Sequence, residues 1–337
     1  MRKSDSLIRR IVYYSVSVYE PPTTCYNPLR KKGIQDGMEI KERSSGKILG
    51  HVFALFSIVV WGSCYVLTKN LLNAGFTALQ ITPIRMALAY VVLLIMRPKF
   101  QRLSWKDELM FILIGIFGGS VYFFLQNTAL TYTYAANVSI IVCLSPIFTA
   151  ILAAIFSRGN ERLGRFLLIG SVLAIAGVVL VVLNGTLNFH LSPVGDLLAL
   201  LAGISWAVYS ILIKRYTETM DGFLVTRRVM FWAFVTSIPL MFLTSGMPNL
   251  TPLFTDTKVL LSWLFLGILG NAVCFALWNI AFRELGVVVT NNYLYGSPFV
   301  TLIVGWLLLD EPISWMGILG AVLITAGVVL AQRDKRA

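Results

Sequence analysis

Stretches of about 20 consecutive apolar residues recur along this chain, with short polar breaks between them. A helix of that length rises about 30 Å, which matches the hydrocarbon core of a bilayer. We therefore predict an all-α polytopic membrane protein with ten transmembrane helices, at residues 48–68, 79–96, 107–130, 134–156, 164–183, 195–213, 224–243, 258–280, 287–309 and 314–331.

The composition excludes several classes of protein. Of the 337 residues, 57% are hydrophobic and 13% are charged, whereas a typical soluble domain has about 25% charged residues. Soluble enzymes, disordered chains and nucleic-acid modules are excluded on that ground. The net charge of +12 comes from 28 Lys and Arg that lie between the apolar runs. This placement indicates orientation in a lipid bilayer and no nucleic-acid partner.

The basic residues gather in alternate breaks between the predicted spans. Residues 97–106 and 158–165 each hold several Lys or Arg, whereas the intervening breaks hold only Lys69 and Lys258. The side of the membrane with more Lys and Arg is the cytoplasmic one. We therefore expect a multi-pass protein of the cell (inner or plasma) membrane with both termini in the cytoplasm.

Both ends of the chain differ from the apolar middle. Residues 1–47 are basic and polar and show no sustained period, so they are predicted to form a disordered tail. Because Met38 begins a short basic lead into the first span, residues 1–37 are also interpreted as a start-site extension. Residues 332–337 are expected to form a basic C-terminal tail.

The two halves of the chain repeat each other. Residues 170–180 and 320–330 agree at eight of eleven positions, and residues 115–130 and 267–282 agree at eight of sixteen. Less common residues match in the same order: Trp61 with Trp206, Lys69 with Lys214, Asn127 with Asn279, and Pro146 with Pro298. Shared apolar composition alone does not produce such matches, so we predict a duplication.

The predicted repeats cover residues 48–183 and 195–331, and residues 184–194 link them. Each holds five spans, an odd number, so the second repeat must insert upside down relative to the first. Two inverted repeats around a site at the bilayer midplane are typical of secondary transporters.

The paired segments resemble the EamA domain of the drug/metabolite transporter superfamily. The family pattern has an early Trp in the first span, a Gly-rich third span, a Pro in the fourth and an acidic residue just before the fifth. Here these features are Trp61, residues 115–119, Pro146 and Glu161. The resemblance implies a ten-helix permease that moves small metabolites, amino acids among them, often outward. It also implies a central cavity lined by the first, third, fourth, sixth, eighth and ninth spans.

Several kinds of chemistry are missing from the sequence. There is no phosphate-binding GxxxxGK[ST] loop, and the two His lie at a membrane boundary and in a loop, so we expect no ATP-driven pump, no metal site and no cofactor. No catalytic constellation indicates an enzyme. Asp and Glu occur at the ends of the predicted spans but not in their interior, which favours uncoupled flux or exchange. Coupling through a boundary acid or the solute's own proton is the alternative.

Polar and aromatic side chains within the spans should face a cavity or a neighbouring helix, because exposure to lipid is unfavourable. Arg85 is the most costly of them, and Arg228 is interpreted as its repeat mate. Snorkelling to the interface is the alternative for both residues, and a helix–helix hydrogen bond is the alternative for each Asn. The cavity candidates are Trp61, Tyr65, Arg85, Tyr122, Gln126, Trp206, Asn271, Trp278, Asn279, Asn291 and Tyr295.

Other residues are interpreted as structural or gating candidates. Lys69 and Lys214 end their spans, where anchoring at the interface is the simpler role. Glu161 and Glu311 precede helices, where the positive N-terminal end of the helix dipole stabilises a carboxylate. Pro146 and Pro298 interrupt the fourth and ninth spans.

These observations predict a secondary carrier for small metabolites that works by alternating access around a midplane cavity. A carboxylate could pair with Arg85 in charge-assisted hydrogen bonds, so amino acids or related zwitterionic or anionic solutes are the expected class. The alternatives are an uncoupled channel, a flippase for lipid-linked substrates, and an accessory membrane subunit that transports nothing. No pattern in the sequence indicates an oligomeric state.

Overall fold

The computed structural model describes residues 32–156, 165–183, 192–309 and 315–331, and the regular elements in these ranges are helices. The first half contains α2 (Lys32–Asn73), α3 (Ala78–Met96), α4 (Trp105–Gly115), η1 (Ile116–Ser120), α5 (Val121–Tyr132), α6 (Ala135–Val142), α7 (Ser145–Phe156) and α8 (Arg165–Leu183). The second half contains α9 (Pro193–Thr219), α10 (Gly222–Thr244), α11 (Thr251–Thr255), α12 (Thr257–Leu264), η2 (Phe265–Val273), α13 (Cys274–Leu285), α14 (Val287–Asn292), η3 (Tyr293–Gly296), α15 (Ser297–Leu309) and α16 (Trp315–Ala331).

Within the described ranges, eight helical stretches are long and apolar enough to cross a membrane. They coincide with eight of the ten predicted spans, and the fifth and tenth predicted spans correspond to α8 and α16. The bounds agree closely: the span predicted at 224–243 is the helix Gly222–Thr244. The prediction of an all-helical, polytopic membrane protein is confirmed.

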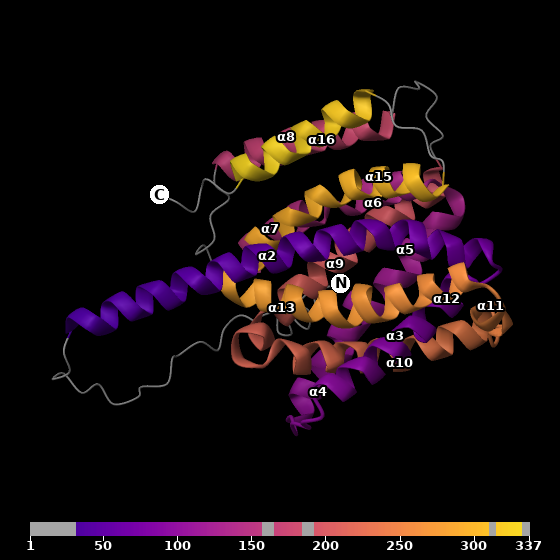
Figure 1. Cartoon of the computed structure of the whole chain (residues 1–337), viewed down its shortest axis with the longest axis horizontal. Coiled ribbons are helices and arrows are strands. Elements are labelled where there is room, and N and C mark those ends of the chain that lie inside the picture. The colour runs from indigo at the N-terminus through magenta and orange to yellow at the C-terminus, as the bar shows by residue number, and fades with distance from the viewer. Residues whose placement is uncertain (1–31, 157–164, 184–191, 310–314, 332–337) are drawn as a thin grey trace, which may run out of the picture.

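The N-terminal tail is shorter than predicted. Helix α2 already begins at Lys32, so the prediction of disorder is wrong for residues 32–47. The stretch of α2 that is apolar enough to cross a membrane begins only at Gly46. The polar start of α2 therefore projects beyond the packed helices (Figure 1). Residues 1–31 and 332–337 lie outside the described residues.

Short polar side chains define where several helices begin. Thr77 and Gln80 form a reciprocal capping box at the start of α3. Ser104, Ser192 and Asp221 accept hydrogen bonds from backbone N–H groups in the first turns of α4, α9 and α10. Each cap satisfies donors that have no partner within the helix. The caps thereby fix which residues lie within the helical bundle.

Irregular segments occur at matching places in the two halves. The π-helical segments η1 and η2 overlap the glycine-containing stretches that align in sequence. Helices α7 and α15 both begin at a Ser-Pro pair, after a break in the helix that precedes each. Pro146 and Pro298 thus mark the interruptions that the sequence predicts. Interrupted helices at membrane depth are typical of transporter binding sites.

One hydrogen bond also recurs between the halves. Asn127 Nδ2 donates to Thr82 Oγ1 at 3.3 Å, and Asn279 Nδ2 donates to Thr226 Oγ1 at 2.9 Å. Both threonine hydroxyls donate in turn to the carbonyl four residues earlier. These bonds place α3 against α5 in the same register as α10 against α13.

That register corrects one predicted pairing. Arg85 lies three residues after Thr82, and the residue three after Thr226 is Val229. The repeat mate of Arg85 is therefore the apolar Val229 rather than Arg228. The charge inside the first half has no counterpart at the matching place in the second.

Helices α8 and α16 pack against each other as a separate layer beside α6, α7 and α15 (Figure 1). Their contact relies on glycine. A Cβ atom at Gly177 would lie 2.5 Å from the carbonyl oxygen of Gly320, and one at Gly327 would lie 2.5 Å from that of Gly170. The two backbones approach too closely for any larger residue at these positions.

Candidate functional site

A small cavity lies in the middle of the bundle, at the level of the interrupted helices. Its volume is about 30 Å³, room for one or two water molecules. Its walls come from seven stretches of the chain: Trp61, Cys64 and Tyr65 of α2, Arg85 of α3, Tyr122, Phe123 and Gln126 of α5, Val142 and Cys143 at the end of α6, Trp206 of α9, Phe275 of α13, and Leu294 and Ser297 around the η3–α15 junction.

Arg85 supplies the charge in this cavity. Its side chain is almost fully buried, with a relative exposure of 1%. Nε and Nη2 both donate to Asn271 Oδ1, at 3.0 and 2.6 Å, and the guanidinium carbon lies 4.3 Å from the ring centre of Phe123. These contacts hold the guanidinium group in place with a neutral partner and an aromatic face.

The hydrogen bonds of Arg85 are incomplete. Nη1 is buried and has no hydrogen-bond partner. Ion pairs among the described residues include those of Arg97 with Asp221, Arg228 with Glu108 and Arg283 with Glu284, and none of these involves Arg85. Ser297, in the same cavity, also has a buried hydroxyl without a partner. The site therefore presents a buried cation and free polar groups to whatever enters.

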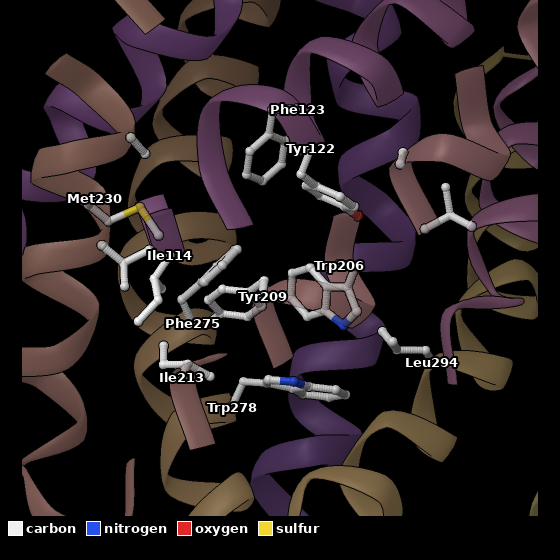
Figure 2. Close-up of a cluster of buried hydrophobic side chains, with 14 of the residues drawn as sticks. Ile114, Tyr122, Phe123, Trp206, Tyr209, Ile213, Met230, Phe275, Trp278 and Leu294 are labelled. Carbon is white, nitrogen blue, oxygen red and sulfur yellow. The ribbon is translucent and has the colours of Figure 1, made fainter. Parts of the chain in front are cut away.

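Aromatic rings form the rest of the wall. The ring centres of Trp61 and Trp206 are 5.3 Å apart with the rings edge to face, and Tyr122 lies 5.2 Å from Trp206. Hydrogen bonds fix the two indoles: Trp61 Nε1 donates to the carbonyl of Gly270 in the other half, and Trp206 Nε1 donates to Asn291 Oδ1 within the second half. Figure 2 shows Trp206 between Tyr122 and Trp278. The site can hold an apolar group by stacking.

The sequence profile of the EamA-like transporter family matches residues 48–183 and again residues 193–332. The chain belongs to the EamA-like transporter family. An uncharacterised transporter from Archaeoglobus fulgidus is 27% identical over 85% of this chain and 98% of its own length. A probable terminal-alkyne amino-acid exporter from Streptantibioticus cattleyicolor is 28% identical over 85% of this chain and 95% of its own.

A solved crystal structure gives the same fold, with a TM-score of 0.67 over 87% of this chain and 98% of that one, at 20% identity. Membership in this family makes the chain a multi-pass membrane transporter and not an enzyme. The superfamily resemblance drawn from the repeats is confirmed.

Six of the eleven predicted cavity residues line the cavity of this family member: Trp61, Tyr65, Arg85, Tyr122, Gln126 and Trp206. They come from the first, second, third and sixth predicted spans. The fourth, eighth and ninth spans also contribute, as expected, through residues that were not singled out. The second span, which the family resemblance did not place at the cavity, lines it through the predicted residue Arg85.

The other five predicted residues have structural partners or lie behind the wall. Asn271 holds Arg85, and Asn279 joins Tyr209 to Thr226. Asn291 accepts from Trp206 and donates to Thr149 on α7. Trp278 is fully buried against Trp61, with ring centres 4.8 Å apart, and Tyr295 is likewise fully buried outside the lining.

The sequence prediction missed Phe123 and Phe275, which both line the cavity and whose ring centres are 6.2 Å apart. A signal for both was present, because they are matched in the aligned segments 115–130 and 267–282. It was overlooked because a Phe in an apolar span looks like ordinary core or lipid-facing surface. Cys64, Cys143, Val142, Leu294 and Ser297 carried no signal that separates them from other core residues.

A group of charged residues closes the end of the bundle predicted to be cytoplasmic. Arg227 donates to the carbonyls of Arg97 and Lys99, each at 2.5 Å, and Arg228 pairs with Glu108. This network ties the segment between α3 and α4 to α10. Arg228 therefore has protein partners and does not simply extend to the interface.

The remaining gating candidates divide between described and undescribed parts of the chain. Lys69 lies at a second, larger hollow near the end of α2. Lys214 is half-buried in the last turns of α9. Glu161 and Glu311 lie outside the described residues.

Proposed function

We propose that this transporter is a carrier for a small anionic or zwitterionic solute, with amino acids as the best-fitting class. The observation behind this proposal is Arg85, a buried guanidinium that lines the cavity, has no acidic partner in the described ranges and has Nη1 unpaired. A buried charge without a partner is costly, and a carboxylate of the solute would compensate it.

The cavity also suits the rest of an amino acid. A carboxylate would receive hydrogen bonds from Arg85 Nη1 and Ser297, in a water-poor site where charge-assisted bonds are strong. An ammonium group would find the ring faces of Tyr65 and Tyr122, and an apolar side chain would stack on Trp61. One relative's description as a probable amino-acid exporter supports this class.

The mechanism we propose is alternating access by ten helices arranged as two inverted five-helix repeats. The matched bonds of Asn127 and Asn279, the matched π-helical segments and the reciprocal glycine contacts of α8 and α16 support the repeat. A cavity of about 30 Å³ is far below the roughly 300–1,000 Å³ of ligand sites, so the described conformation is closed around the site. Solute binding must therefore accompany opening of one half against the other.

Competition in proteoliposomes tests this function. Uptake of labelled L-phenylalanine and L-leucine would be measured against excess unlabelled amino acid or the matched amine, phenethylamine or isoamylamine. We expect the amino acids to compete at least tenfold better, because the amines lack the group that Arg85 binds. Equal competition by the amines contradicts the proposal, and so does the absence of saturable uptake for either amino acid.

Variants at position 85 connect that result to the site. Arg85→Gln should reduce uptake at least tenfold, while Arg85→Lys should retain part of it because the charge persists. Lys258→Gln is the matched control, since it removes an exposed cation outside the cavity. Membrane levels of each variant must equal those of the wild type.

A further inference from the structure

A second space opens at the end of the bundle where α2 and α5 end. Its volume is about 500 Å³, much larger than that of the central cavity. Residues from the last turns of both helices and from the 131–134 segment line it, among them Lys69, Leu72, Asn73, Leu130, Thr131 and Tyr134. We call this space the α2–α5 vestibule.

The vestibule continues the path of the central cavity along the same two helices. Tyr65 and Lys69 are four residues apart on α2, as are Gln126 and Leu130 on α5, so each pair lies on one helix face. The first member of each pair lines the cavity and the second lines the vestibule. The vestibule therefore lies about one helical turn beyond the cavity on the same faces of α2 and α5.

Lys69 is the cation of the vestibule. Its ammonium nitrogen is 3.4 Å from the carbonyl oxygen of Thr133 and 5.2 Å from the ring centre of Tyr134. The ion pairs found in the described ranges do not include it. An ammonium group has three N–H donors, so donors remain for a ligand beside the hydroxyls and the amide of the lining.

We propose that the α2–α5 vestibule is a second, transient anion-binding site, where Lys69 captures the carboxylate of the solute on its way to or from Arg85. This inference rests on the proposed function for the identity of the solute. The anion preference of the vestibule does not depend on it. A half-buried cation at the mouth of a path, such as Lys69, raises the local concentration of anions and the rate at which they arrive. By the charge bias of the loops, this mouth faces the outside of the cell.

The electrostatic part is tested without any transported solute. In a variant with its four native cysteines replaced by alanine, Thr131→Cys places an exposed thiol in the vestibule. Its modification rates by an anionic sulfonatoethyl and a cationic trimethylammonioethyl methanethiosulfonate are then compared. One charge several ångströms away changes each rate about twofold in opposite directions, so Lys69→Gln should lower the anion-to-cation rate ratio about fourfold.

Controls separate charge from structure. Lys69→Arg should keep the wild-type ratio. Lys258→Gln removes a cation on another helix and should leave the ratio unchanged. High salt should lower the ratio in the Lys69 protein and have little effect in Lys69→Gln. If the ratio changes neither in Lys69→Gln nor with salt, the proposed anion site is wrong, even when the competition experiment supports an amino-acid carrier.

Transport kinetics test the capture step. Lys69→Gln should raise KM for external L-phenylalanine about threefold or more and leave kcat near the wild-type value, whereas Arg85→Gln should reduce uptake at least tenfold. A lowered rate ratio with an unchanged KM overturns capture, because the vestibule would then attract anions without lying on the solute's route. If amines compete as well as amino acids, the proposed function is wrong. The rate ratio then still shows whether the vestibule prefers anions.

Discussion

The side-chain oxygen of Asn271 accepts from two nitrogens of Arg85, and this contact defines the role of both residues. Asn271 has no further acceptor to offer a solute, and its Nδ2 points to the sulfur of Met86 at 3.1 Å. Asn271 therefore holds the Arg85 guanidinium in place through Nε and Nη2 and leaves Nη1 without a partner.

Removing Asn271 should expose the cost of the buried charge. Hydrogen bonds to charged groups contribute about 1.5–3 kcal/mol each, so Asn271→Ala should lower the thermal unfolding temperature in detergent and reduce uptake. The double variant Arg85→Met with Asn271→Ala should unfold at a higher temperature than Asn271→Ala alone, because no unpaired cation remains. Additive effects of the two substitutions would show that the pair is not coupled.

At this scale the sequence reveals unusual residues better than it reveals partners. Arg85, Trp61 and Trp206 could be predicted as site residues because a charge or an indole is rare within an apolar span. The role of Asn271 could not be predicted, because its hydrogen bond to Arg85 joins residues that are 186 positions apart in the sequence. Nothing in a single chain marks which of several buried amides meets which cation.

Among the elements, apolar length predicts helices well and predicts their irregularities poorly. The spans predicted at 79–96 and 287–309 coincide with the helical stretches Ala78–Met96 and Val287–Leu309 almost to the residue. The proline breaks were also predictable, since Pro removes a donor. The π-helical segments η1 and η2 were not, because they depend on how closely glycines on one helix meet a neighbour, as Gly119 meets Ala233.

The pairing of α8 with α16 gives a test of that close approach. Gly177→Leu should lower the thermal unfolding temperature, with a cost of about 1–3 kcal/mol, because the new side chain would meet the backbone of Gly320. Gly327→Leu should do the same against Gly170. Val179→Leu, on an exposed position of the same helix, is the matched control and should change little. Unchanged stability in both glycine variants would rule out the α8–α16 contact.

For the molecule as a whole, the contacts of Arg227 and Arg228 lie at the same end of the bundle as the Lys-rich and Arg-rich loops. Arg227 and Arg228 bind the segment after α3 at the end of the bundle that the positive-inside rule assigns to the cytoplasm. The other end of α3 is held without charge, by Gln80 Nε2 donating to the carbonyls of Ser245 and Gly246. The two ends of α3 are thus held by different chemistry.

Cysteine labelling in intact cells tests this orientation. On the cysteine-free background, Asn73→Cys should react with an impermeant maleimide, whereas Gln101→Cys should react only after the membrane is opened. Both side chains are exposed, so accessibility is decided by the side of the membrane alone. The reverse pattern would invert the orientation and move the α2–α5 vestibule to the cytoplasmic face.

The small volume of the central cavity has a consequence for the leakage of protons and cations across the membrane. Protons cross a protein readily along an unbroken file of hydrogen-bonded water, and a space for one or two molecules cannot hold such a file. The buried guanidinium of Arg85 adds a repulsive barrier to any cation at the same depth. We therefore expect the protein to conduct neither protons nor other cations in a conformation whose central cavity is this small.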